Sequence, residues 1–173
     1  MQTTTVIELF AALKKQIAAL ARRLDDRNPP APPVSSIPTE PDNRLDRLLE
    51  MARQAMLRSY SPYSGYPVGA ALLCADGRVF QGCNIENASF GLTNCAERTA
   101  MFKAVSEGAR EFTAIAIASR DAAPWPCGAC RQVLNEFAPN IRVLVTWQGG
   151  TESATLPELL PHGFGPQQLT TKE

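Results

Sequence analysis

The pattern of apolar positions divides the chain into three parts, and the first predicts an amphipathic helix over residues 1–27. Thr5 to Glu8 has the form of a capping box, which opens a helix. Apolar residues then recur at spacings of four and three, the seam of a coiled coil: Val6, Phe10, Leu13, Ile17, Leu20 and Leu24. Three heptads are near the lower limit for this structure. A helix that rests on its own domain, and a weak membrane-surface helix, are the alternatives.

The second part, residues 28–42, contains six of the fourteen prolines. Proline lacks an N–H group and restricts the residue before it, so this stretch predicts an extended, semi-rigid linker. The alternative is a proline-rich ligand for an aromatic groove, but no flanking pattern supports it.

The third part, residues 43–173, has the pattern of apolar and polar residues that is typical of a globular domain. Its apolar periodicity predicts helices over 45–60, 95–107, 128–137 and 156–160, and strands over 68–73, 78–85, 112–118 and 141–146. The Ala75-Asp76-Gly77 turn joins the first two strands as a hairpin. Alternating helices and strands after this pair indicate an α/β layer fold with a mixed sheet.

Composition narrows the function classes. Seventeen Lys and Arg balance seventeen Asp and Glu, so no cationic surplus indicates binding to nucleic acid or to an anionic membrane. The single histidine, His162, excludes a metal site that needs two, and five cysteines cannot all pair within one chain. The sequence has neither a secretory signal nor an apolar run of membrane-spanning length, which predicts a soluble, cytosolic protein with reduced thiols.

The candidate chemistry lies in two short stretches, residues 94–98 and 126–130, which each open a predicted helix. Three thiolates, from Cys95, Cys127 and Cys130, can hold Zn²⁺ tetrahedrally and leave the fourth corner for water. A helix N-terminus lowers the pKa of a thiol because its dipole favours the anion. These stretches therefore predict a catalytic zinc site over two helix ends.

Two charged residues beside Cys95 suit that site. Glu97 is expected to take a proton from the zinc-activated water and to return it to the substrate. Arg98 is expected to offset the negative charge of the thiolates through hydrogen bonds to sulfur.

Each motif alone has a plainer interpretation. Cys127 and Cys130 match a redox pair, or half of a four-thiolate site completed by Cys74 or Cys83, and Glu97 matches the capping-box partner of Asn94. Cys74 and Cys83 lie on predicted strands, where a buried apolar role is expected. Taken together, Cys-x-Glu followed 32 residues later by Pro-Cys-x-x-Cys is the signature of zinc nucleobase deaminases.

Four phrases in this order extend the signature: YSGYPVGAAL (63–72), GCNIENA (82–88), NCAERTA (94–100) and PCGACRQV (126–133). With them, residues 45–169 resemble the small, homotetrameric, free-nucleoside cytidine deaminases. The resemblance implies a three-layer α/β/α fold with a mixed five-stranded sheet, and one Zn²⁺ per subunit. It also implies hydrolytic deamination of cytidine and deoxycytidine to uridine and deoxyuridine, with release of ammonia, in pyrimidine salvage.

The resemblance assigns roles residue by residue. Cys95, Cys127 and Cys130 are the implied zinc ligands and Glu97 the implied proton shuttle. The implied substrate-binding residues are Asn84 and Glu86 at the ribose, the backbone at Ala96 at the pyrimidine O2, Tyr66 against the base, and Phe164 entering a neighbouring subunit's site. Without the resemblance, Asn84 and Glu86 are better interpreted as polar residues that end a strand.

Three residues depart from the family pattern. Tyr66 replaces a usual Phe, so its hydroxyl needs a partner or exposure, Phe90 replaces a common Tyr, and His162 occupies a usually small position. The helix and linker lie outside the resemblance, and a partner for that helix is expected but not identified. Two other functions stay open: deamination of a modified cytosine nucleoside such as blasticidin S, and a non-catalytic zinc-stabilised interaction module.

Overall fold

The structure is a computed structural model that describes residues 12, 14–16 and 41–169. The chain divides into two units, residues 1–35 and 36–173. In the first unit, Ala12 and residues 14–16 are helical and exposed. The predicted heptad seam and the proline-rich linker lie outside the described residues and stay predictions. Within the described part, no helix is both long and apolar enough to cross a membrane.

The second unit is built on one mixed five-stranded sheet, as the sequence and the resemblance led us to expect. The strand order is β2-β1-β3-β4-β5. The strands are β1 (Val68–Cys74), β2 (Val79–Cys83), β3 (Phe112–Ser119), β4 (Arg142–Trp147) and β5 (Gly150–Thr155). The β3–β4 pair is parallel and the other three pairs are antiparallel. Because β3 and β4 are parallel, their carboxyl ends lie at the same edge of the sheet. Helix α4 forms the connection from β3 to β4.

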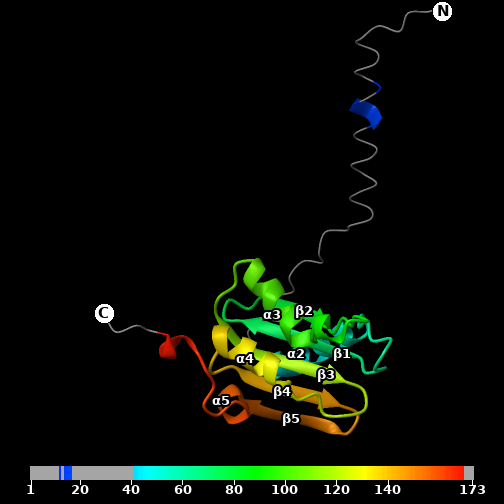
Figure 1. Ribbon diagram of the computed structural model, residues 1–173. Helices are drawn as coiled ribbons and strands as arrows, with labels where there is room; N and C mark the ends of the chain where they lie inside the picture. The colour runs from blue at the N-terminus through cyan, green and yellow to red at the C-terminus, as the bar shows by residue number, and fades with distance from the viewer. Residues whose placement is uncertain (1–11, 13, 17–40, 170–173) are drawn as a thin grey trace, which may run out of the picture. The chain divides into compact units, whose positions relative to one another are not determined.

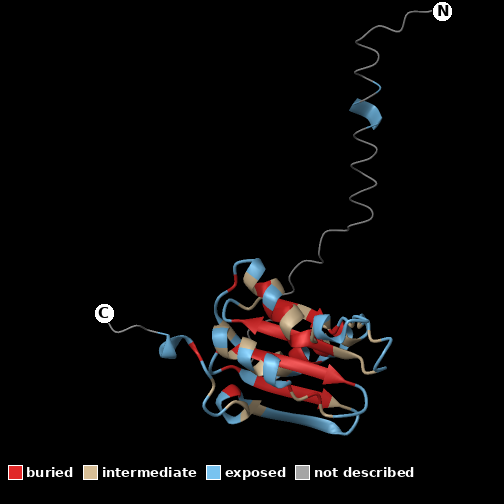
Figure 2. Ribbon diagram, viewed as in Figure 1, coloured by how far each residue is buried: buried red, intermediate tan, exposed pale blue. Residues whose placement is uncertain are grey.

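Helices cover both faces of this sheet, which confirms the three-layer fold (Figure 1). Helix α2 (Pro41–Met56) packs on one face, while α3 (Ala96–Ser106) and α4 (Gly128–Phe137) pack on the other. Three short helical segments complete the unit: η1 (Phe90–Leu92), α5 (Leu156–Leu159) and η2 (Pro166–Gln168). Figure 2 shows the central strands buried between the helical layers. They hold α3 and α4 against the sheet, and so fix the helix ends that carry the candidate chemistry.

Two glycines set how closely the helices approach the sheet. A Cβ added at Gly69 of β1 lies 2.2 Å from the Ala52 carbonyl oxygen on α2. A Cβ added at Gly82 of β2 lies 2.4 Å from the Ala100 nitrogen on α3. Both distances are closer than real Cβ contacts, so a side chain at either position forces a helix away from the sheet. Gly82 matters for the site because α3 begins at the predicted zinc ligand Cys95.

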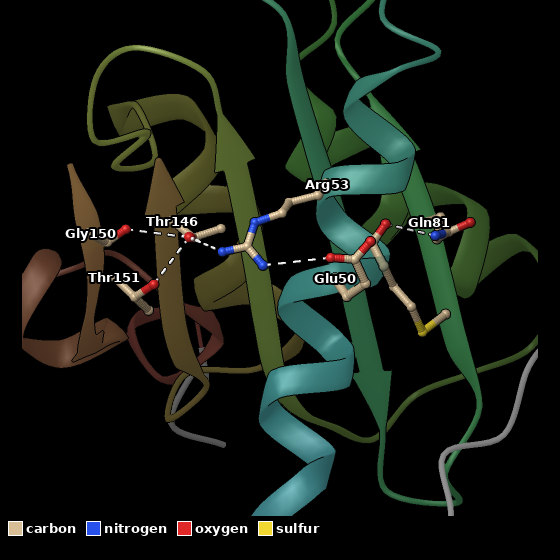
Figure 3. Close-up of polar contacts among 7 residues, drawn as sticks. Glu50, Arg53, Gln81, Thr146, Gly150 and Thr151 are labelled. Carbon is tan, nitrogen blue, oxygen red and sulfur yellow. Dashed lines mark hydrogen bonds and ion pairs between the residues drawn. The ribbon is translucent and has the colours of Figure 1, made fainter. Parts of the chain in front are cut away.

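A polar network ties α2 to strand β4 (Figure 3). The Arg53 Nη2 atom donates to the Thr146 Oγ1 atom at 2.8 Å, and the Thr151 Oγ1 atom donates to the same hydroxyl at 3.0 Å. Thr146 is buried, so its hydroxyl needs these partners. The network joins the helical layer to the β4–β5 hairpin on a face where β5 is mostly exposed.

The structure differs from the sequence-based boundaries at several places, among them the end of α2, which lies at Met56 and not at residue 60. The run of residues 150–155 was not predicted as a strand, because it is polar and largely exposed and so carries no apolar alternation. Strand β2 ends at Cys83, two residues early, because Ile85 leaves the sheet to form isolated bridges with Tyr60 and Asn94. Helix α2 begins at Pro41, inside the expected linker, since proline suits the first helical turn.

Candidate active site

Two helix ends bring three cysteines together, as the sequence predicts. Cys95 is the N-cap of α3, Cys127 is the N-cap of α4, and Cys130 lies in the first turn of α4. The sulfur atoms of the three all lie within 4.8 Å of one another. Among the described residues, this is the only group of His, Cys, Asp or Glu side chains found close enough to hold a metal ion.

The geometry of this group fits zinc. The Cys127 and Cys130 sulfurs are 3.6 Å apart, and the Cys95 and Cys127 sulfurs are 4.0 Å apart. With Zn–S bonds of about 2.3 Å, a tetrahedral site places neighbouring sulfurs about 3.8 Å apart. The three sulfurs therefore lie at the spacing that one Zn²⁺ ion requires, and they leave one tetrahedral position without a protein ligand.

The electrostatics of the group favour a thiolate at Cys95. Hydrogen bonding by the Cys130 side chain, followed by the nearby Arg98 guanidinium, lowers the pKa of Cys95 to about 5. The same contact with Cys95, followed by burial, raises the pKa of Cys130. The Arg98 Nη2 atom lies 3.7 Å from the Cys95 sulfur and donates to the Thr93 carbonyl oxygen at 3.1 Å. This position suits the charge-offsetting role expected for Arg98.

Glu97 is a buried carboxyl group beside these sulfurs. Its side chain is only 5% exposed, in the first turn of α3. Burial is the main cause that raises the pKa of Glu97 to about 7. A carboxyl group with this pKa changes protonation state readily near neutral pH, as a general acid–base catalyst must.

The structure also decides between interpretations that the sequence left open. The N-cap of α3 is Cys95 and not Asn94, so Glu97 is not the third residue of a capping box, and the Asn94 Nδ2 atom donates instead to the Thr99 hydroxyl at 3.0 Å. Cys74 and Cys83 lie outside the metal-ligand group, and all five cysteines are free. Cys74 is buried as expected, whereas Cys83 is partly exposed, with its sulfur 3.2 Å from the Arg58 carbonyl oxygen. A four-thiolate site is therefore excluded.

The two residues expected at the ribose lie just after β2. The Asn84 Oδ1 atom accepts hydrogen bonds from the Ser59 hydroxyl at 2.5 Å and the Val68 N–H at 2.8 Å, and Asn84 Nδ2 donates to the Tyr66 carbonyl oxygen at 2.9 Å. Both oxygen lone pairs are thereby used, and one N–H of Asn84 is left.

Glu86 holds the loop before β1. Its carboxylate accepts from the Tyr63 N–H at 2.8 Å and from the Ser64 hydroxyl at 2.5 Å. The Ser64 hydrogen bond is the main cause that lowers the pKa of Glu86. The carboxylate is therefore an anion at neutral pH, and because the Ser64 N–H also donates to it at 3.3 Å, one lone pair remains for a further donor.

The remaining predicted residues lie on three different elements. Ala96 is buried at the start of α3, directly beside Cys95. Tyr66 is half-buried before β1, and its hydroxyl donates to the Ala122 carbonyl oxygen at 3.2 Å. The Phe164 side chain is 56% exposed. Its carbonyl oxygen accepts hydrogen bonds from Gln132 Nε2 at 2.7 Å and Asn135 Nδ2 at 2.9 Å, so α4 holds the C-terminal segment in place.

Sequence reasoning missed one residue that orients the site. Arg131 follows Cys130 on α4, and its Nε atom donates to the Pro126 carbonyl oxygen at 2.7 Å. Its Nη1 atom donates to the Leu159 carbonyl oxygen, also at 2.7 Å. Arg131 thus fixes the residue before Cys127 against α5. The available signal was its place directly after the Cys-x-x-Cys pair.

Comparison with known proteins identifies the family. Residues 42–146 match the family described as the cytidine and deoxycytidylate deaminase zinc-binding region. A cytidine deaminase from Halalkalibacterium halodurans is 52% identical over 130 residues, which cover 72% of this chain and 98% of the relative. A cytidine deaminase from Sporosarcina psychrophila is 46% identical over 129 residues, which cover 73% of this chain and 95% of the relative.

Solved structures agree with this result. The crystal structure of cytidine deaminase from Burkholderia pseudomallei has a TM-score of 0.67 and 48% identity, and the match covers 69% of this chain and 98% of that chain. A blasticidin-S deaminase from Bacillus cereus is less similar, with 31% identity over 126 residues, which cover 66% of this chain and 87% of the relative. With its cluster of three cysteines and these relatives, the chain belongs to the cytidine and deoxycytidylate deaminase family.

Proposed function

We propose that this protein is a zinc-dependent cytidine deaminase that hydrolyses cytidine and deoxycytidine to uridine and deoxyuridine and releases ammonia. One observation carries the proposal: the buried Glu97 carboxyl group, with a pKa of about 7, lies beside three cysteine sulfurs spaced for one metal ion. A merely structural zinc site has no need of a buried, ionisable carboxyl group.

The chain supplies the metal ligands and the proton transfer. Cys95, Cys127 and Cys130 hold the Zn²⁺ ion, which when bound supplies the Lewis acidity that makes water a nucleophile at neutral pH. Glu97 accepts a proton from the attacking water and delivers it to ring N3. It then delivers the second proton to the 4-amino group, which leaves as ammonia. Arg98 stabilises the thiolate of Cys95 during these steps.

Around the base and the sugar, the proposed contacts use groups that the fold leaves available. The Glu86 carboxylate accepts a ribose hydroxyl with its remaining lone pair, and Asn84 donates its remaining N–H. Backbone at Ala96 binds the pyrimidine O2, and the Tyr66 ring packs against the base. In this proposal Asn84 is a donor to the sugar, because both lone pairs of its side-chain oxygen are already occupied.

We further propose that the active assembly is a homotetramer, that the enzyme works in the cytosol, and that it serves pyrimidine salvage. Large apolar side chains are exposed on the loop before β1 and on the segment between β2 and α3, which includes η1: Tyr63, Ile85, Phe90 and Leu92. The Tyr63 and Phe90 rings pack edge to face with their centroids 6.0 Å apart. Ile85 forms an isolated β-bridge with Asn94, the residue before Cys95. An apolar surface at the edge of a polar site favours coverage by another subunit.

The first test of the function is a spectrophotometric assay with cytidine, deoxycytidine and blasticidin S side by side, with zinc quantified on the same samples. We expect turnover of both nucleosides at about one zinc per chain, as a single three-thiolate site requires. Turnover of blasticidin S alone contradicts the proposed substrate. Bound zinc with no turnover of any of the three supports the interaction module instead.

The role of Phe164 in a neighbouring site can be tested by complementation. We expect Phe164→Ala to lower kcat/KM about tenfold or more, because an exposed aromatic anchor is lost from an interface. In mixed tetramers, a Phe164→Ala subunit keeps Glu97, and a Glu97→Gln subunit supplies Phe164. Random mixing then makes about a quarter of the sites complete, because each site draws on two neighbouring subunits. No recovery in mixed tetramers, measured against each variant alone, contradicts an active site shared between subunits.

A further inference from the structure

The hydroxyl group of Tyr66 joins two segments that both lead to the candidate active site. Tyr66 belongs to the loop between α2 and β1, where its N–H donates to the Ser64 hydroxyl oxygen at 3.0 Å and its carbonyl oxygen accepts from Asn84 Nδ2 at 2.9 Å. The Tyr66 backbone is thus held by Asn84, which is proposed to contact the sugar, and by the Ser64 side chain, which is itself bound to Glu86. From this anchored position the side chain reaches across to the Ala122 carbonyl oxygen at 3.2 Å.

Ala122 lies in residues 120–126, the segment that connects the end of β3 to Cys127. Among the described residues, two backbone hydrogen bonds involve this segment, at Arg120 and between Trp125 and Ala123. Two of its seven residues, Pro124 and Pro126, have no N–H group to donate. The segment therefore depends on side chains for its position.

Two hydroxyl groups converge on one carbonyl oxygen of this segment. The Ser119 hydroxyl donates to the Ala122 oxygen, and the Tyr66 hydroxyl donates to the same atom. A carbonyl oxygen has two lone pairs, so these two bonds complete it. The Ser119 bond is local, three residues away along the chain, whereas the Tyr66 bond spans 56 residues. Tyr66 alone of the two connects the segment to the loop on the substrate side.

We propose that Tyr66 is a positioning residue whose hydroxyl fixes the segment before Cys127 relative to the loop that binds the nucleoside. The expected effect on substrate rests on the proposed function. The hydrogen bond from Tyr66 to Ala122 concerns only the segment before Cys127 and does not depend on that function. The bond holds the base-contacting side of the site at a set distance from the metal centre. It also limits how often the Cys127 segment opens, because local opening must break it.

Tyr66→Phe tests this directly, because it keeps the ring and removes only the hydroxyl. We expect KM for cytidine to rise about three- to tenfold, the effect of one neutral hydrogen bond, while kcat stays within about twofold. We also expect zinc to transfer to a chelator about three- to tenfold faster, because the loss of the same hydrogen bond makes the segment before Cys127 open more often. Tyr60→Phe is the matched control, because no hydrogen bond to the Tyr60 hydroxyl is found within the described chain. Its KM and its rate of zinc transfer should therefore equal those of the wild type.

Ser119→Ala separates the two connections to Ala122. We expect it to speed zinc transfer without raising KM, because the link to the substrate-side loop remains. If Tyr66→Phe matches Tyr60→Phe in both KM and zinc transfer, or lowers only the melting temperature, the positioning role is overturned. If the wild type turns over no nucleoside, the proposed function fails, and the zinc-transfer rates still decide whether Tyr66 restrains the Cys127 segment.

Discussion

Replacing Glu97 with Gln is expected to lower kcat for cytidine by about a thousandfold, the range of general acid–base catalysis, while zinc stays bound. Gln has nearly the same shape, so the buried pocket at the start of α3 stays filled. It cannot exchange a proton, so neither N3 nor the leaving amino group is protonated by the enzyme. The measurement is steady-state kinetics together with the zinc content of the same samples.

The control for this change lies on the same helix. Glu107 is the C-cap of α3, at the end opposite the metal centre, and it is exposed. We expect Glu107→Gln to keep kcat within about twofold, because a surface charge outside the site has little effect. A Glu97→Gln enzyme that keeps more than a tenth of the wild-type kcat, with zinc bound, contradicts the proton-transfer role.

Replacing Cys130 with Ser is expected to weaken zinc binding more than about a hundredfold, since even residues that only orient a metal ligand cost up to that much. Cys130 is fully buried in the first turn of α4, and its sulfur lies 3.6 Å from that of Cys127. A serine hydroxyl does not ionise near neutral pH, so the site loses one of its three anionic ligands. Dialysed samples should contain less than one tenth of a zinc ion per chain, with no measurable turnover.

Two further variants guard this experiment against misfolding. Cys127→Ser changes an exposed cysteine of the same group and leaves the core intact, and it should also lose zinc. Cys83→Ser changes a partly exposed cysteine outside the group and should keep about one zinc per chain. Chelator-treated wild type should regain turnover when Zn²⁺ is added, whereas Cys130→Ser should not. Full zinc occupancy in Cys130→Ser, or zinc loss in Cys83→Ser, contradicts the assigned ligand set.

The order of most α/β elements and the cluster of three cysteines could be predicted from the sequence for local physical reasons. Short, nearly continuous apolar runs mark β1, β3 and β4, because their neighbours bury them on both faces. Cys95 and Cys127 cap two helices, and Glu97 and Cys130 follow in their first turns, so the spacing along the chain predicts a cluster over two helix ends. Strand β5 was not predicted, because its polar, mostly exposed side chains carry no strand pattern. Its backbone pairing with β4 makes it a strand.

The tertiary structure decided what depends on contacts between distant segments. The sulfur distances between α3 and α4, the burial that raises the pKa of Glu97, and the occupied oxygen of Asn84 all arise from packing across the sheet. The hydroxyl of Tyr66, which the sequence could mark only as a departure, finds its partner 56 residues away at Ala122. The sequence was enough to predict which groups take part in the proposed chemistry, because residue type sets what a side chain can ligate or protonate. Only the fold decided how those groups are charged, oriented and held, because those properties depend on neighbours that the linear order does not reveal.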